Sequence, residues 1–248
     1  MSLDDAELDR LRARRWQLLG VALLALVVLL GIAIAGGALG GGGEKGTRSA
    51  NGIRGAKETQ ALLRGVPQRG LVLGRPDAPA TITLFADLHC PFCRSDVTGD
   101  ELRTLIDDQV RPGKANLELR LLGRLAPNSQ QGRMAVDALA ARGRAWNLAV
   151  MLFFNQGPEG GNWIDDRLLR RIGEVGPGLA GLPLSVREDA GGRRLMAETD
   201  ALAKRWDVGG TPSYFVGARG GRDAREIGRS ALGGRAGRIG DAVAELQP

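Results

Sequence analysis

The pattern of apolar and polar residues divides the chain into a short apolar N-terminal stretch and a longer part of mixed composition. Residues 16–43 include no charged side chain, and Leu18 to Ala35 are all Leu, Val, Ala, Ile or Gly. About 20 apolar residues suffice for a helix to cross a bilayer. We therefore predict one N-terminal transmembrane helix over residues 16–38.

The charges that flank this stretch predict its orientation. Arginines 10, 12, 14 and 15 precede it, and the first basic residue after it is Lys45. Basic residues stay on the cytoplasmic side of a membrane helix, so residues 1–15 are predicted to be cytoplasmic. A signal peptide cleaved after Ala33-Ile34-Ala35 is the alternative, but the apolar run exceeds the roughly 7–15 residues typical of such peptides. We expect a single-pass protein of the cell membrane whose main domain lies outside the cytoplasm.

Downstream, the pattern predicts a linker and then an α/β domain. Residues 39–65 are rich in Gly and polar residues without sustained periodicity, which indicates a flexible linker. From residue 66 onward, short apolar runs predict strands over 71–73, 81–85, 117–122, 214–216 and 225–227. Helices are expected over about 93–110, within a long helical block that occupies about 125–207, and at the C-terminus.

Composition and charge change this picture little. The formal net charge of +6 comes from an excess of arginine. These arginines are scattered among acidic residues and form no basic stripe interleaved with aromatic residues, so we expect a solvated surface and no nucleic-acid partner.

The candidate chemistry lies in Cys90 and Cys93, the only two cysteines, which directly follow the strand at 81–85. Pro91 suits the first turn of a helix, which places Cys90 at the helix N-cap and Cys93 one turn further on. Unpaired N–H groups and the helix dipole favour an anion there, so Cys90 should be the thiolate of lowered pKa. The spacing allows a disulfide between the two sulfurs, and we interpret the pair as redox-active.

Three other interpretations of the cysteine pair are weaker. A zinc or iron–sulfur site needs about four ligands, and His89 is the only histidine; we therefore expect no metal. Copper(I) delivery through Cys90, Cys93 and His89 is a further alternative. An inert structural disulfide would close almost no loop and stabilise the fold little.

A second motif, residues 209–213, precedes the strand at 214–216. Pro212 cannot donate to a central ladder. A cis Thr211–Pro212 bond in a tight turn and an ordinary trans proline at a strand start both satisfy this position.

Together these motifs resemble the DsbA-like branch of the thioredoxin superfamily. The resemblance rests on FADLHCPFC at 85–93, GRPDAPATITLF at 74–85 and GTPSYFVG at 210–217. It implies an α/β thioredoxin fold with an inserted helical subdomain over residues 66–248. It further implies that Cys90 is the exposed nucleophile, Cys93 the buried resolving cysteine and Pro212 a cis-proline facing them. Thr211 would offer its backbone to substrates.

The same resemblance assigns redox tuning to Pro91 and Phe92, the residues between the cysteines. Strongly oxidising relatives carry histidine where this chain has Phe92, which cannot donate to a thiolate. His89 would compensate as a tuning residue or lie on the surface. Leu84 stands where several relatives have a buried carboxylate. Asp87 is nearby, as a capping or proton-relay group or as a contact of the loop.

We therefore expect an exported thiol–disulfide oxidoreductase that promotes disulfide formation, with the Cys90–Cys93 disulfide and no other cofactor. Its expected partners are exported cysteine-containing proteins and a DsbB-like or VKOR-like membrane protein that reoxidises it, or else a reductant. The alternatives are a reductase or isomerase of the same fold and a non-catalytic exported peptide-binding or chaperone module.

Overall fold

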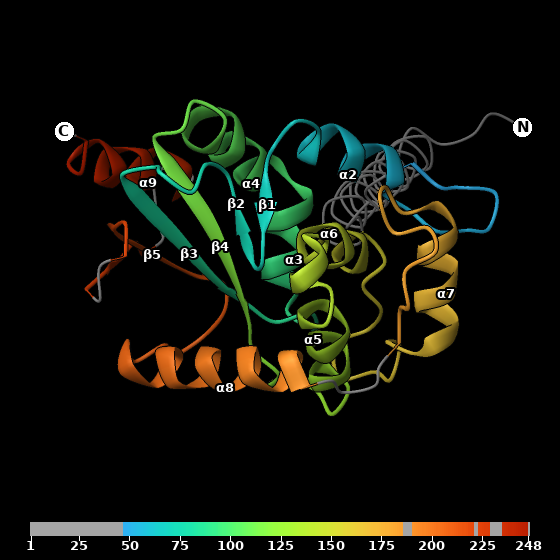
Figure 1. Cartoon of the computed structure of the whole chain (residues 1–248). Helices are drawn as coiled ribbons and strands as arrows, with labels where there is room; N and C mark the ends of the chain where they lie inside the picture. The colour runs from blue at the N-terminus through green and yellow to red at the C-terminus, as the bar shows by residue number, and fades with distance from the viewer. Residues whose placement is uncertain (1–46, 186–189, 221–222, 229–234, 248) are drawn as a thin grey trace, which may run out of the picture. The chain divides into compact units, whose positions relative to one another are not determined.

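The computed structural model describes residues 47–185, 190–220, 223–228 and 235–247 (Figure 1). The predicted cytoplasmic segment and transmembrane helix lie outside these described residues. Among the helices of the described ranges, none combines the length and apolar character that crossing a bilayer requires.

A six-stranded sheet forms the centre of the domain, in the order β1-β2-β4-β3-β5-β6. Its strands are β1 (Gln68–Arg69), β2 (Val72–Leu73), β3 (Ala80–Ala86), β4 (Ala115–Leu121), β5 (Ser213–Ala218) and β6 (Arg225–Glu226). β3 pairs parallel with β4 and antiparallel with β5, so that Ile82 lies between Leu117 and Val216. The five strands that the hydrophobic pattern predicted are confirmed, and β1 is an additional edge strand.

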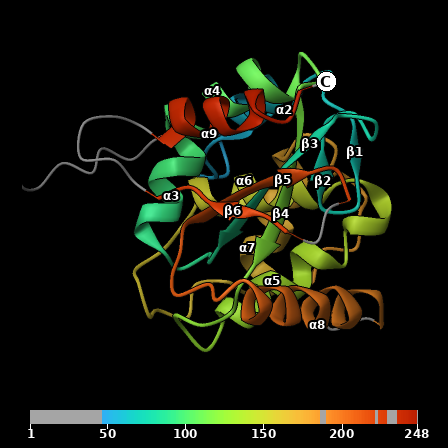
Figure 2. The same ribbon diagram turned by 90° about the vertical axis from the view of Figure 1, so that its left-hand side faces the viewer.

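Helices cover both faces of this sheet (Figure 2). Alternate residues of β3 point to opposite faces, which divides the core into two clusters. Ile82 and Leu84 belong to the large cluster, on the side of α4 (Asp100–Leu105) and α9 (Arg235–Ala244). Phe85 belongs to a smaller cluster with residues of β5 and of α8 (Ala190–Arg205). Because both faces of the sheet are buried at β3, the sequence of this strand is a nearly continuous apolar run.

The helix expected after Cys93 is interrupted. α3 (Pro91–Thr98) and α4 are separated by Gly99, which has extended backbone angles of φ −100° and ψ −158°. A π-helical turn, Ile106–Val110, follows α4. The prediction of a single continuous helix was wrong, whereas its end at Val110 is confirmed.

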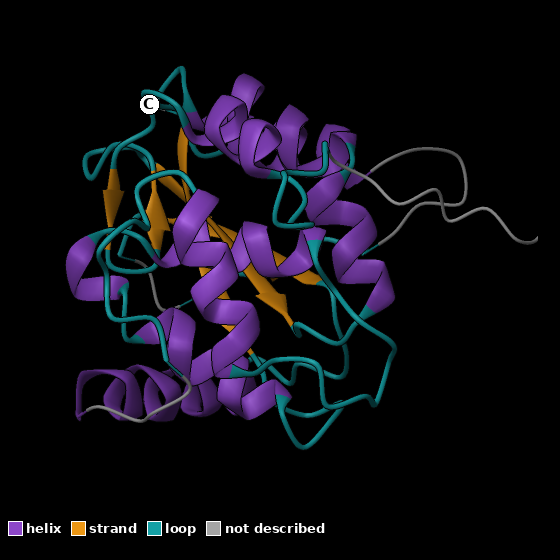
Figure 3. Cartoon of the chain, turned by 90° about the vertical axis from the view of Figure 1, so that its right-hand side faces the viewer, coloured by secondary structure: helices purple, strands orange, loops and turns teal. Residues whose placement is uncertain are grey.

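The predicted helical insertion is confirmed and packs against α3. Figure 3 shows helices (purple) in front of the strands (orange) on this side of the molecule. The insertion comprises α5 (Ser129–Asp137), a 3-10 turn (Ala140–Arg142), α6 (Ala145–Phe154), α7 (Asp166–Val175) and α8. Every residue of α6 is buried, and this helix packs against α2, α3 and α5.

The predicted flexible linker over 39–65 was wrong for its described part. Residues 56–63 form helix α2 (Ala56–Leu63), which buries Leu62 and Leu63. Ile53 is 1% exposed, and a Cβ atom added at Gly55 would lie 2.2 Å from the ring of Phe154. A helix of 8 residues is too short to be stable by itself, so its packing against α6 stabilises it. Residues 39–46 lie outside the described residues.

Candidate active site

The two cysteines lie where β3 gives way to α3. Pro91 is the first residue of α3 and Cys90 is its N-cap, with φ −76° and ψ 116°. The backbone N–H of Cys93 donates to Sγ of Cys90 over 3.3 Å. The sequence prediction of a sulfur at the helix N-terminus is therefore confirmed by geometry.

Both cysteines are free thiols and both are buried. Cys93 is fully buried and Cys90 is 3% exposed. The expectation of an exposed nucleophile was therefore wrong for this structure. The reason is the proline-containing turn that precedes β5, because the carbonyl oxygen of Thr211 lies 3.3 Å from Sγ of Cys90.

The two thiols differ sharply in acidity. The pKa of Cys90 is lowered to about 6, first by its hydrogen bond with the Cys93 side chain, then by the Thr211 side chain and by N–H groups of Cys93 and Phe92. Burial acts against this shift. The pKa of Cys93 is raised far above its usual range by burial and, secondly, by its hydrogen bond with Cys90. At neutral pH the pair therefore holds a thiolate at Cys90 and a thiol at Cys93.

The Thr211–Pro212 peptide bond is cis, which selects between the two options that the sequence left open. Both residues are half-buried. Ser213 begins β5, and its hydroxyl donates to the carbonyl of Gly210 over 3.0 Å. The turn thus presents the Thr211 backbone directly beside Cys90.

Pro91 and Phe92 lie on the outside of the site. Both are exposed, and the Phe92 side chain is 60% exposed. The backbone N–H of Phe92 contributes to lowering the pKa of Cys90, whereas its aromatic ring has no N–H or O–H group to donate.

His89 is buried, so the alternative of a surface histidine was wrong. Its Nε2 lies 2.6 Å from the side-chain amide of Asn128. The indole N–H of Trp163 donates to its Nδ1 over 3.2 Å, and the two rings are 5.0 Å apart. Both ring nitrogens are thus engaged by the helical insertion, and thiolate tuning by His89 stays a prediction.

Asp87 is a buried contact of the loop. Its carboxylate accepts from the backbone N–H of His89 at 2.9 Å and the hydroxyl of Ser129 at 2.8 Å. It also accepts from the N–H groups of Arg124 at 2.8 Å and Leu125 at 3.2 Å. Of the roles considered for Asp87, the structure shows the loop contact.

Residues 67–224 match the family model described as Thioredoxin. The chain belongs to the thioredoxin family. Its match spans β1 to β5, both cysteines and the cis-proline turn, so the sequence-based recognition of the family is confirmed.

Solved structures are similar to this fold over most of the chain. Oxidised BdbD from Bacillus subtilis aligns with a TM-score of 0.54 at 16% identity, covering 73% of this chain and 96% of BdbD. α-DsbA1 from Wolbachia pipientis gives 0.53 at 14% identity, covering 76% and 94%. A thioredoxin-like oxidoreductase from Silicibacter pomeroyi gives 0.50 at 23% identity, covering 75% and 95%. These similarities establish a DsbA-like thioredoxin fold.

Curated sequence relatives carry a different name. The Na(+)/H(+) antiporter NhaA 1 of Mycolicibacterium gilvum is 33% identical over 181 residues, which is 70% of this chain and 28% of the antiporter. NhaA 1 of Mycobacterium sp. (strain KMS) is 29% identical over 180 residues, with the same coverage. This chain therefore spans less than a third of these relatives.

The sequence did not predict that three further residues belong to this site: Asn128, Gln156 and Trp163. Asn128 and Trp163 hold His89. The side-chain amide of Gln156 donates to the carbonyls of Leu88 and Cys90. None of the three belongs to a motif, and only the packing of the insertion reveals their proximity.

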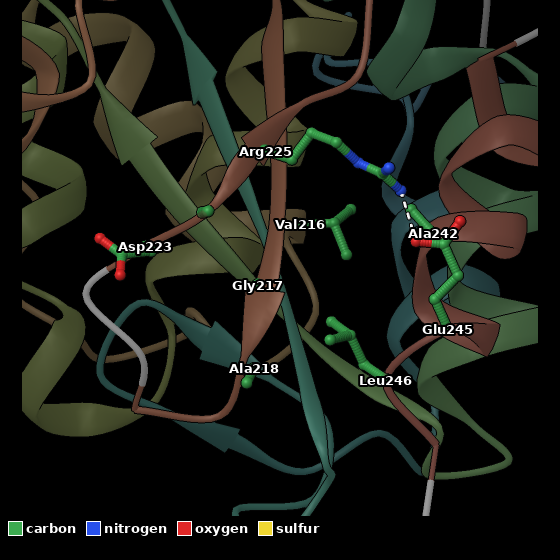
Figure 4. A pocket seen from close by; sticks show the side chains of 9 residues that line it. Val216, Gly217, Ala218, Asp223, Arg225, Ala242, Glu245 and Leu246 are labelled. Atoms are coloured by element: carbon green, nitrogen blue, oxygen red, sulfur yellow. Dashed lines mark hydrogen bonds and ion pairs between the residues drawn. The ribbon is translucent and has the colours of Figure 1, made fainter.

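A separate cavity of about 440 Å³ lies between β5, β6 and α9 (Figure 4). Arg225 and Glu245 form an ion pair of 2.9 Å at its edge. Its sheet residues, Val216 to Ala218, lie toward the end of β5 that pairs with Ala80, whereas the cysteines follow the other end of β3. The cavity is distinct from the redox site. Within the described ranges, no group of three His, Cys, Asp or Glu side chains is placed to hold a metal ion.

Proposed function

We propose that this protein is an extracytoplasmic thiol–disulfide oxidoreductase that promotes disulfide formation in exported proteins. The observation that carries the proposal is the asymmetry of the two sulfurs. Cys90 has a pKa of about 6 at the N-terminus of α3, and Cys93 is fully buried with a raised pKa. A thiolate that is stable in the reduced protein makes the disulfide form a better oxidant.

The first step would be attack by a client thiolate on Sγ of Cys90 in the Cys90–Cys93 disulfide. The bond to Cys93 breaks, a mixed disulfide forms between the client and Cys90, and Cys93 takes up a proton. Because burial raises the pKa of Cys93, this cysteine ends the step as a thiol.

In the second step, another client thiolate attacks the client sulfur of the mixed disulfide. The client leaves with a disulfide and Cys90 leaves as a thiolate, which the N–H of Cys93 stabilises. The client has lost two electrons and the cysteine pair has gained them. A DsbB-like or VKOR-like membrane protein would reoxidise the pair, and no other cofactor is required.

The location outside the cytoplasm is supported by the sequence. The apolar stretch at 16–38 and the arginines before it favour a membrane anchor with a cytoplasmic N-terminus. Disulfide formation also belongs to oxidising compartments. The antiporter name belongs to relatives of which this chain spans 28%, and we do not extend it to this chain.

A disulfide reductase is the second candidate, and Phe92 is the residue that favours it. Its ring offers the Cys90 thiolate no donor beyond those already present, which limits the oxidising power of the pair.

Refolding of a reduced, disulfide-requiring protein tests the proposal and separates the two directions. We expect the oxidised protein to restore client activity and Cys90→Ser to abolish this effect. Offered a client that already contains a disulfide, Cys93→Ser should accumulate a mixed disulfide visible by non-reducing electrophoresis, because its Cys90 thiolate attacks the client disulfide and no Cys93 thiol is present to release the client. Reduction of insulin without any refolding activity would favour the reductase. A wild-type protein that performs no thiol exchange would refute both.

A further inference from the structure

The backbone that carries the redox sulfur is held by the helical insertion through one side chain. Gln156 follows the end of α6, and its single amide nitrogen donates to the carbonyl of Leu88 over 2.7 Å and to that of Cys90 over 3.0 Å. Between these two carbonyls lie His89 and the N–H of Cys90, which itself donates to the carbonyl of Asp87 over 3.0 Å. The segment lies between β3 and α3, where no sheet ladder holds it.

The carbonyl of Cys90 is the critical acceptor. It also receives the first helical hydrogen bond of α3, from the N–H of Arg94 over 3.1 Å. A carbonyl oxygen has two lone pairs, so Gln156 and Arg94 together occupy both. The direction of this carbonyl is set by ψ of Cys90, and the same torsion relates the sulfur to the first turn of the helix.

We propose that Gln156 is a positioning residue, which holds the backbone of Cys90 so that its sulfur stays against the N-terminus of α3. Gln156 does not touch the sulfur. It acts through Leu88 and Cys90, while Trp163 and Asn128 hold the intervening residue His89. The helical insertion thereby governs the reactivity of a site built on the thioredoxin core.

The consequence is chemical as well as structural. The groups that lower the pKa of Cys90 are the Cys93 side chain and N–H, the Thr211 side chain and the N–H of Phe92; Cys93 is the titratable group among them. Each acts only while the sulfur remains at the helix N-terminus. A looser Cys90 backbone weakens them together and destabilises the thiolate.

The test is the pH dependence of Cys90 alkylation by iodoacetamide in the reduced full-length protein. For Gln156→Ala we expect the pKa of Cys90 to rise by about 0.5 to 1, which slows alkylation at pH 6 about two- to fivefold. Gln156→Glu keeps the length of the side chain and replaces the donor by an acceptor, and it should raise the pKa at least as far. In equilibration with glutathione, both variants should hold a larger fraction of the Cys90–Cys93 disulfide than the wild type, because the reduced form with its Cys90 thiolate is less stable.

Gln68→Ala is the matched control. Gln68 is also half-buried, and its amide donates to Asn147 of α6 over 2.8 Å, away from the cysteines. The Gln68→Ala substitution should lower the melting temperature slightly and leave the pKa of Cys90 unchanged. The proposal is overturned if both Gln156 variants keep the wild-type pKa, if Gln68→Ala raises it as far, or if the Gln156 variants fail to fold. The readout needs no client protein, so it is independent of whether the protein oxidises or reduces its clients.

Discussion

The sulfur of Cys90 lies 3.3 Å from the carbonyl oxygen of Thr211, although the two residues are 121 positions apart in the chain. This contact joins the start of α3 to the cis-proline turn before β5. It leaves Cys90 only 3% exposed while its pKa is lowered to about 6. The site therefore combines a reactive thiolate with restricted access, and both properties can be measured.

The reactivity of Cys90 should follow its lowered pKa. In the reduced protein, we expect alkylation by iodoacetamide to reach half its maximal rate near pH 6. An ordinary cysteine would do so near about pH 8.5. Cys90→Ser should remove this fast phase, because Cys93 is fully buried and has a raised pKa. Mass spectrometry of the alkylated peptide identifies the residue, and an inflection above pH 8 would contradict the site geometry.

The same pKa makes the stability of the reduced protein depend on pH. A group whose pKa is lowered by folding stabilises the folded state above its unfolded pKa and loses this contribution as pH falls through its folded pKa. Relative to Cys90→Ser, the reduced wild type should therefore gain stability between about pH 6 and pH 9. Urea unfolding of both proteins across this range checks the sign, and a difference that shrinks with rising pH would contradict it.

Phe92→His should make the pair more oxidising. The side chain is 60% exposed, so the substitution costs little packing, and an imidazole adds a donor and partial positive charge near the thiolate. Each unit by which the pKa of Cys90 falls corresponds to about 30 mV of a two-electron potential. We expect an increase of about 30 mV in glutathione equilibria. Phe92→Ala, which removes the ring and adds no donor, is the control and should change the potential much less.

Asp87→Ala should destabilise the whole domain. The substitution leaves the buried donors of His89 and Ser129, and the part-buried N–H groups of Arg124 and Leu125, without their acceptor. Unsatisfied buried donors cost about 1–3 kcal/mol each, reduced where water replaces the acceptor, so we expect a loss of at least about 3 kcal/mol in urea unfolding. Asp107→Ala removes only a surface ion pair with Arg111 and should cost less than about 1 kcal/mol. Equal losses in the two variants would show that Asp87 does not hold the loop.

Gly55→Ala tests whether the segment before residue 66 belongs to the folded domain. Gly55 has φ +82°, and an added Cβ would lie 2.2 Å from the Phe154 ring. Gly65 has φ +74° with no atom within 4 Å. Both substitutions should lower the free energy of unfolding by about 1–2 kcal/mol, because alanine is strained in the left-handed backbone conformation. Gly55→Ala must also displace the buried ring of Phe154. It should therefore lower the melting temperature by clearly more than Gly65→Ala, and similar shifts would mean that α2 does not dock on α6.

The sequence was most informative where local rules decide the structure. A β-branched run followed by Cys-Pro-x-Cys defines β3, the N-cap and the first turn of α3 from neighbouring residues alone. It was least informative where tertiary contacts decide. The apolar positions of α2 are few and follow a glycine-rich segment, so no clear helical periodicity marks the helix in the sequence. Its stability depends on packing against α6. His89 is buried by Asn128 and Trp163, which lie 39 and 74 residues further along the chain, and no local pattern could reveal them.

The exposure of Cys90 illustrates the same limit. Its place at the helix N-cap follows from Pro91 next to it, whereas its burial follows from Thr211 in a distant turn. A family resemblance suggested that the turn faces the cysteines, but the close contact that covers the sulfur appears only in three dimensions.

The reduction potential of the Cys90–Cys93 pair is the most direct test of the central claim. Equilibration of the full-length protein with glutathione buffers, followed by alkylation and mass spectrometry, measures it without any client. The strong oxidant DsbA has a potential of about −120 mV and the reductant thioredoxin one of about −270 mV. A disulfide-forming enzyme should give a two-electron equilibrium closer to the first value. A potential closer to the second, or a pair that never exchanges with glutathione, would contradict the proposed role.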